Sequence, residues 1–199
     1  MIKAIVFDYG GVLAFPGDFD ILKNTYSKLF GIPVDTFYPI FRKNWNLWKT
    51  DKLNEVQFWE ENSKEFGFDY DFEQVKEILR NINTLNEEIV PLIKGLRTNY
   101  KVYILSNQTR EWLGDEIKRF NFNELFDDIF ASYDAKSAKP GKEIYLKFLE
   151  KFNLKADECV FIDDKKENVD TARELGFKGI IFTSLEQLKL DLKKLDVEV

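Results

Sequence analysis

Carboxylates, lysines, hydroxyls or a hard metal must supply the chemistry of this 199-residue chain, because it contains no histidine and a single cysteine. It therefore cannot form a Ser-His-Asp or Cys-His nucleophile or a histidine-ligated zinc site. Polar residues follow three short apolar runs, and these residues are Asp8, Ser106 with Asn107, and Asp163 with Asp164. If the runs are parallel strands of one sheet, these residues converge where open α/β sheets bind ligands.

Three carboxylates brought together in this way would repel one another. The pKa values of Asp8, Asp163 and Asp164 would rise, and their charges would oppose folding unless a cation lay among them. Mg²⁺ prefers oxygen ligands and needs neither histidine nor cysteine. The sequence therefore predicts a magnesium site at this end of the sheet.

The elements that position these residues follow an α/β rhythm. Short, nearly continuous apolar runs span 2–7, 101–105, 159–162 and 179–182, as is typical of strands buried on both faces of a parallel sheet. Amphipathic helices are predicted between them over 87–97, 143–152 and 165–175. Strands that alternate with helices indicate an α/β fold.

Residues 15–85 break this rhythm. They are predicted to form four consecutive amphipathic helices, and they hold 15 of the 31 aromatic residues, enough for a core of their own. These helices are expected over 19–30, 34–49, 54–66 and 72–82. Because the α/β pattern starts before this segment and resumes after it, we predict an α/β domain of residues 1–14 and 86–199 and an inserted helical domain of residues 15–85.

Composition and charge narrow the expected partners. The formal net charge of −6 disfavours nucleic-acid binding, which depends on neutralising phosphates. No apolar run approaches the ~20 residues that span a bilayer, and the N-terminal apolar stretch is too short for a signal peptide. A single cysteine fits a reducing compartment. We expect a cytoplasmic protein without membrane or nucleic-acid partners, present as a monomer or a weak homodimer.

Four motifs, in order and over nearly the whole chain, resemble those of the haloacid dehalogenase superfamily. They are the run FDYGGVL at 7–13, Ser106 after an apolar strand, Lys139 before a proline, and the paired acids at 163–164. The resemblance implies a Rossmann-like parallel sheet with a small helical cap inserted after the first strand. It is greatest to small phosphatases with glycine two residues after the first aspartate, such as bacterial glucose-1-phosphate phosphatases and the N-terminal domain of soluble epoxide hydrolase.

The resemblance also implies catalytic and metal-binding roles. Asp8 would attack phosphorus and form an aspartyl-phosphate that water then hydrolyses. Mg²⁺ would be held by Asp8, the carbonyl of Gly10 and Asp164, with Asp163 as a further ligand or directly behind the ligands. The metal would shield the nucleophile from the charge of the phosphate.

Phosphate binding is assigned by the same resemblance. Ser106 and the N–H of Asn107 would bind phosphate oxygens, and Lys139 would neutralise charge in the transition state. The expected substrate is a small phosphorylated metabolite. Taken singly, Ser106 and Lys139 would suit an ordinary loop, and Asp164 with Glu167 has the spacing of a helix capping box, a role compatible with metal binding.

Gly10 departs from the family pattern. Most phosphatases of the family carry a second aspartate there, and proton transfer by such a group is typically worth ~10²–10⁴-fold in rate. Either Asp18, Asp20 or another residue of the inserted helices supplies the proton, or the leaving group needs little help, as in a sugar 1-phosphate. The candidates for selecting the substrate are Phe15, Asp18, Arg42, Lys43, Trp45 and Trp48.

Two other functions remain open. A metal-independent 2-haloacid dehalogenase of the same fold is disfavoured by the intact pair Asp163 and Asp164, which those enzymes lack. A non-catalytic binding domain is suggested by Gly10, yet Asp8 and Lys139 are both present, whereas a drifting site would lose several such residues. Phosphotransfer to an acceptor other than water is a variant of the first function.

Overall fold

A five-stranded, wholly parallel sheet forms the centre of this computed structural model, which describes residues 1–16, 19–67, 73, 76–78 and 81–199. The strand order is β5-β4-β1-β6-β7, with β1 in the middle. The strands are β1 (Ala4–Phe7), β4 (Lys101–Ser106), β5 (Asp128–Ala131), β6 (Cys159–Asp163) and β7 (Lys178–Ile181). The register pairs Phe7 with Ile104 on one side and Ile162 on the other. The residue after Phe7 therefore lies between the ends of β4 and β6.

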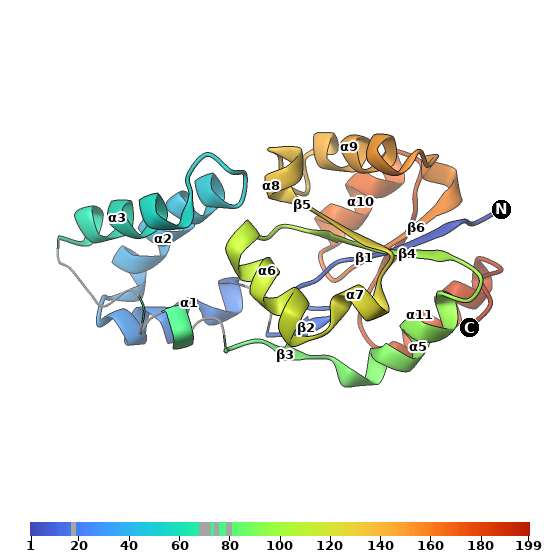
Figure 1. The fold of residues 1–199 in the computed structure, drawn as a ribbon, viewed down its shortest axis with the longest axis horizontal. Helices are drawn as coiled ribbons and strands as arrows, with labels where there is room; N and C mark the ends of the chain where they lie inside the picture. The colour runs from blue at the N-terminus through green and yellow to red at the C-terminus, as the bar shows by residue number, and fades with distance from the viewer. Residues whose placement is uncertain (17–18, 68–72, 74–75, 79–80) are drawn as a thin grey trace.

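Helices cover both faces of this sheet (Figure 1). Ile5 and Phe7 of β1 are buried against one group of helices, which is α5 (Val90–Leu96), α7 (Phe122–Leu125) and α11 (Leu185–Lys194). Ala4 and Val6 are buried on the opposite face against α9 (Lys142–Phe152) and α10 (Lys166–Glu174). Helices α6 (Arg110–Arg119) and α8 (Ser132–Ala135) and the 3-10 turns Glu87–Ile89 and Ala156–Glu158 complete this part of the fold.

This three-layer arrangement confirms the predicted α/β fold and the four predicted strands, with bounds that differ by one or two residues. The prediction missed β5, because its four residues begin with an exposed aspartate and only the last two are buried. Such a short edge strand lacks the continuous apolar run of a central strand. None of the helices in the described parts of the chain has the length and apolarity needed to cross a membrane.

The inserted helices α1 (Phe19–Phe30), α2 (Val34–Trp48) and α3 (Glu55–Phe66) pack around an aromatic cluster of their own. Its buried rings include Tyr26, Phe30, Phe37, Phe41, Phe58 and Trp59. Asn54 and Gln57 form a capping box at the start of α3, and Gly67 ends it with a φ of 77°. Of the fourth predicted helix, 72–82, the structure describes residues 73, 76–78, 81 and 82, of which 73 and 76–78 are helical.

Two tryptophans join the inserted helices to the α/β layers. Trp45 and Trp48 of α2 contact Trp112 of α6, with ring centroids 5.1 Å and 5.4 Å apart. The indole N–H of Trp48 also donates to Glu111 Oε2 at 2.9 Å. Contacts of this kind hold α2 over the sheet end where β1 and β4 finish.

A short antiparallel ribbon, β2 (Ala14–Phe15) with β3 (Thr84–Leu85), carries the chain into and out of the inserted helices. Next to it, the Asn83 side chain donates to Glu116 Oε1 at 2.8 Å and to the Tyr9 hydroxyl at 3.4 Å. Arg119 donates to the Asn83 carbonyl at 2.7 Å. This network ties the ribbon and α6 to Tyr9, two residues after the end of β1.

Glu116 in this network is 5% exposed, and burial raises its pKa above the usual 4.5. Hydrogen bonds from Asn83 and Tyr9 act to lower this pKa but do not cancel the effect of burial. The native state therefore holds this proton more tightly than the unfolded chain. The resulting stability is complete below pH 4.5 and is lost as pH rises through the raised pKa. We expect Glu116→Gln to flatten the fall of unfolding free energy with rising pH, measured by denaturant unfolding across pH 4–8.

The matched control is Glu124→Gln, which alters an exposed residue on the neighbouring α7 and should keep the wild-type slope. Identical pH profiles for Glu116→Gln and the wild type would contradict the assignment.

Candidate active site

Three carboxylates meet where β1 and β6 end. Asp8, Asp163 and Asp164 each offer an oxygen, and these oxygens lie within 4.8 Å of one another. The parallel register of β1 and β6 places Asp8 beside Asp163. Asp8 is 8% exposed and Asp163 is completely buried, so little water screens the repulsion between them. The sheet thus brings together the three acids that the sequence singled out.

Lys139 lies between two of these acids. Its Nζ is 2.7 Å from Asp8 Oδ1 and 2.7 Å from Asp163 Oδ2, and its side chain is buried. Burial works to lower the pKa of Lys139, but the charges of Asp163 and Asp8 outweigh it and raise that pKa. The ammonium therefore stays charged. With all three acids ionised, one ammonium leaves the cluster with a formal charge of −2.

Asp8 is held in one orientation. Its Oδ1 accepts the N–H of Tyr9 at 2.6 Å as well as the contact from Lys139. Burial raises the pKa of Asp8 well above its usual value, and Asp163 adds to the rise, while Lys139 opposes it. A divalent cation at the cluster would favour the charged form that a nucleophile needs.

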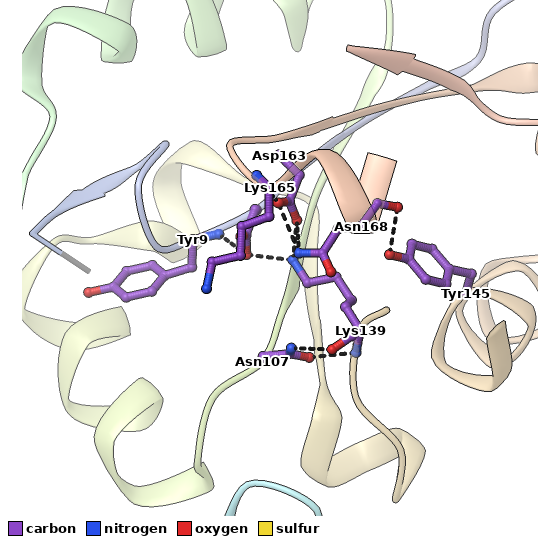
Figure 2. Close-up of polar contacts among 8 residues, drawn as sticks. Tyr9, Asn107, Lys139, Tyr145, Asp163, Lys165 and Asn168 are labelled. Atoms are coloured by element: carbon purple, nitrogen blue, oxygen red, sulfur yellow. Dashed lines mark hydrogen bonds and ion pairs between the residues drawn. The ribbon is translucent and has the colours of Figure 1, made fainter. Parts of the chain in front are cut away.

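Asp163 is bonded on both oxygens within the protein. Oδ1 accepts the N–H of Lys165 at 2.8 Å, and the Asn168 amide donates to Oδ1 at 2.9 Å and to Oδ2 at 3.0 Å. The Tyr145 hydroxyl in turn donates to the Asn168 carbonyl at 2.9 Å (Figure 2). Since Lys139 also contacts Oδ2, Asp163 is engaged in positioning that lysine.

Asp164 is half-buried and faces the turn that follows β1. A Cβ built on Gly11, whose φ is +76°, would lie 2.4 Å from Asp164 Oδ2. Glycine therefore satisfies both the backbone conformation and the close approach of the carboxylate. The suggestion that Asp164 caps the next helix is wrong, because the N-cap of α10 is Lys165 and makes no side-chain cap bond.

The end of β4 supplies the other side of the site. Ser106 is its last residue and is 2% exposed. The Asn107 amide donates to the Lys139 carbonyl at 2.8 Å and accepts the Lys139 N–H at 2.8 Å, as Figure 2 shows. The Asn107 side chain thus fixes the backbone that presents the lysine.

A cleft with about 590 Å³ of empty space, its open mouth included, lies over these groups. It is lined from the α/β layers by Asp8, Tyr9, Gly10, Ser106, Asn107, Gln108, Lys139, Lys165 and Asn168. From α2 and its C-cap it is lined by Arg42, Trp45 and Lys49.

Some of the residues proposed to select the substrate line this cleft and others do not. Arg42 and Trp45 line it. The other three that the structure describes do not line it. Lys43 forms an ion pair with Glu65, with its Nζ 2.7 Å from Glu65 Oε2. Trp48 is buried in the aromatic cluster at 2% exposure, and Phe15 on β2 is 41% exposed. Asp18 and the side chain of Asp20 lie outside the described residues.

Sequence reasoning missed three cleft residues, which are Lys49, Gln108 and Lys165. Lys49 follows Arg42 by seven positions, so helical periodicity from Arg42 could have indicated it. Gln108 and Lys165 directly follow Asn107 and Asp164 but belong to no motif that carries chemistry by itself.

Comparison with known proteins agrees with this architecture. The family model described as haloacid dehalogenase-like hydrolase matches residues 2–176. A D-ribitol-5-phosphate phosphatase from Bacteroides thetaiotaomicron is 29% identical over 189 residues, which cover 89% of this chain and 90% of the relative.

Solved structures show the same fold. A predicted HAD-like family hydrolase from Porphyromonas gingivalis is similar with a TM-score of 0.83 and 26% identity over 100% of both chains. A HAD family enzyme from Bacteroides thetaiotaomicron in complex with magnesium is similar with a TM-score of 0.78 and 24% identity, over 92% of this chain and 94% of that one. The chain therefore belongs to the haloacid dehalogenase-like hydrolases, with a Rossmann-like α/β core that carries its acids at the strand ends.

Proposed function

We propose that this hydrolase is a Mg²⁺-dependent phosphatase that acts on a small phosphorylated metabolite through an aspartyl-phosphate on Asp8. The proposal rests on one observation: Lys139 Nζ lies 2.7 Å from Asp8 Oδ1, and Asp8 belongs to a cluster of three carboxylates. The name of the relative that acts on D-ribitol 5-phosphate supports a sugar-like or polyol-like phosphate ester.

The two steps follow from the residues at the cleft. A carboxylate oxygen of Asp8 attacks phosphorus, the bond from phosphorus to the ester oxygen breaks, and the alcohol leaves. Water then attacks the phosphorus of the aspartyl-phosphate, which releases inorganic phosphate and regenerates Asp8. Lys139 and the hydroxyl of Ser106 stabilise the charge on the phosphoryl oxygens in both steps.

Mg²⁺ fits the oxygen donors at this sheet end. We propose that Asp8, Asp164 and the Gly10 carbonyl hold the ion, since their oxygens are hard ligands and the cluster carries two excess negative charges. Asp163 stands behind these ligands, because both of its oxygens already accept hydrogen bonds. When bound, Mg²⁺ supplies charge that polarises the phosphoryl group and screens it from the attacking carboxylate.

We further propose that the protein is a cytoplasmic monomer or weak homodimer, and that its two domains have different roles. Residues 1–14 and 86–199 carry the catalytic groups, and residues 15–85 form a cap that covers the cleft and selects the substrate. Arg42, Trp45 and Lys49 reach the cleft from this cap, while the aromatic contacts to Trp112 hold it in place.

The proposal is tested by hydrolysis of p-nitrophenyl phosphate. We expect activity with Mg²⁺, its loss in excess chelator with recovery on adding Mg²⁺ back, and a fall in kcat of at least about 10³-fold in Asp8→Asn, which lacks the nucleophile. The exposed Asp157→Asn on a remote turn is the matched control. Full activity in chelator or in Asp8→Asn would exclude this function and favour the metal-free chemistry of dehalogenases.

A second prediction concerns the space for Asp164. Gly11 and Gly31 both have a positive φ, so alanine at either should cost about 1–2 kcal/mol of stability through backbone strain. Only the Gly11 Cβ would meet a carboxylate, at 2.4 Å from Asp164 Oδ2, whereas the Gly31 Cβ meets nothing within 4 Å. We expect Gly11→Ala to weaken Mg²⁺ binding in calorimetric titration by more than about tenfold, equivalent to 1.4 kcal/mol.

The matched variant Gly31→Ala should bind Mg²⁺ as the wild type does, although it shares the backbone strain. Equal Mg²⁺ affinities for the two variants would show that Asp164 does not hold the ion.

The third prediction follows from the missing carboxylate at position 10. If no group protonates the leaving alcohol, an anomeric or aryl phosphate should be cleaved much faster than a primary alkyl phosphate such as a hexose 6-phosphate. Gly10→Asp should narrow this gap by raising kcat on the alkyl ester, because proton donation acts in the transition state. Gly10 is not among the glycines of the described residues that have a positive φ.

Steady-state kinetics on both ester types, together with unfolding and Mg²⁺ affinity of the variant, check this prediction. Equal wild-type rates on the two types would mean that another residue supplies the proton.

A further inference from the structure

Four cationic side chains line the cleft, which are Arg42, Lys49, Lys139 and Lys165. Among its described lining residues, Asp8 contributes the one carboxylate. Lys139 belongs to the ionic cluster, where it contacts Asp8 and Asp163. The other three cations therefore belong to the walls, and two of them come from α2 and its C-cap rather than from the strand ends.

Arg42, Trp45 and Lys49 follow one face of α2. They are spaced three and four positions apart, which places side chains above one another along a helix. All three line the cleft, whereas Lys43, one position on from Arg42, reaches Glu65 on the outer side at 2.7 Å. The side of α2 that faces the cleft thus carries two cations, Arg42 and Lys49, with the indole of Trp45 between them.

The position of Lys49 is fixed by the α/β layers. Its carbonyl accepts the Ser132 hydroxyl at 2.6 Å, and Ser132 is itself completely buried. Two residues on, Asp51 forms ion pairs with Lys136 and Arg110. The C-terminal end of α2 is therefore held against α6 and α8, and Lys49 keeps its place at the cleft.

Lys49 is only 8% exposed. Lys49 lines the cleft, and a charge-assisted hydrogen bond formed in such a largely desolvated place is stronger than one in open water. The phosphoryl group of a substrate is already placed at the other wall by Asp8, Ser106 and Lys139. The cations on α2 thus have the position and the charge to bind a different anionic group of the same molecule.

We propose that Arg42 and Lys49 bind a second anionic group of the substrate, so that the enzyme selects phosphate esters carrying a carboxylate or a second phosphoryl group over esters of neutral sugars and polyols. This inference rests on the proposed phosphatase function and narrows its substrate class. Trp45 between the two cations packs against the carbon skeleton that links the two charges.

Three α-anomeric esters that differ only at carbon 6 test the proposal. They are glucose 1-phosphate, glucuronate 1-phosphate and glucose 1,6-bisphosphate, with release of the anomeric phosphate as the readout. We expect kcat/KM to be at least about tenfold higher for one or both charged esters, since a charge-assisted hydrogen bond is stronger than one between neutral groups. Which charged ester is preferred distinguishes a carboxylate from a second phosphoryl group.

The variants Arg42→Met and Lys49→Met should each lower the ratio of kcat/KM between the preferred charged ester and glucose 1-phosphate by about 10-fold or more, mainly through KM. Lys43→Met, next to Arg42 on the outer side of α2, should keep the wild-type ratio. Lys49→Arg retains the charge and should retain most of the selectivity, which separates the loss of charge from a loss of folding at this buried position.

Equal wild-type kcat/KM values for the three esters, or variants that lower all three by the same factor, would overturn the inference. If p-nitrophenyl phosphate is still hydrolysed in an Asp8-dependent manner, the phosphatase function stands without it. Absence of hydrolysis of all three sugar esters would likewise overturn the inference, and the phosphatase function fails as well only if p-nitrophenyl phosphate is also not hydrolysed.

Discussion

The burial of ionised groups at the ends of β1 and β6 constrains the rest of the structure. Asp8 and Asp163 are neighbours because the parallel register pairs Phe7 with Ile162, and the Asp8 N–H continues this pairing by donating to the Ile162 carbonyl at 2.8 Å. Their repulsion is reduced by Lys139, which contacts both at 2.7 Å. A negative excess remains once Asp164 is included, and this excess is what fits the site to a divalent cation.

Several neighbouring groups hold the cluster in place through uncharged hydrogen-bond donors and acceptors. Asn168 and the Lys165 N–H donate to Asp163, and the Asn107 side chain holds the backbone of Lys139. Such contacts fix the lysine so that its ammonium is oriented before substrate binds. The cations on α2 are built separately, on a helix with its own aromatic core. The proposed catalytic groups and the proposed substrate-selecting groups therefore lie on separate parts of this fold.

The sequence was sufficient for the central strands and for the convergence of their acids, because buried parallel strands are continuous apolar runs. It did not indicate β5, where Asp128 interrupts the apolar pattern at an edge. It also left the role of Asp163 open, because the bonds from Asn168 and the Lys165 N–H depend on how the chain turns after β6. The capping interpretation of Asp164 failed at the same turn, since α10 begins one residue later than the pattern predicts. Helical spacing from Arg42 puts Lys49 on the same face of α2, but the fact that this face meets the cleft depends on the docking of α2 on Ser132.

The ionic cluster also bears on whether Gly10 marks a site that has lost its chemistry. Replacing a buried ion pair by well-packed apolar residues is often neutral or stabilising, so a domain that served only as a binding module would gain little from keeping Asp163 and Lys139 charged and buried. Position 10 is different, because it lines the open cleft and a carboxylate there can be lost without unpairing any buried charge. A chain that retains the costly groups and lacks the inexpensive one is better explained by a leaving group that needs no proton donor than by loss of catalysis.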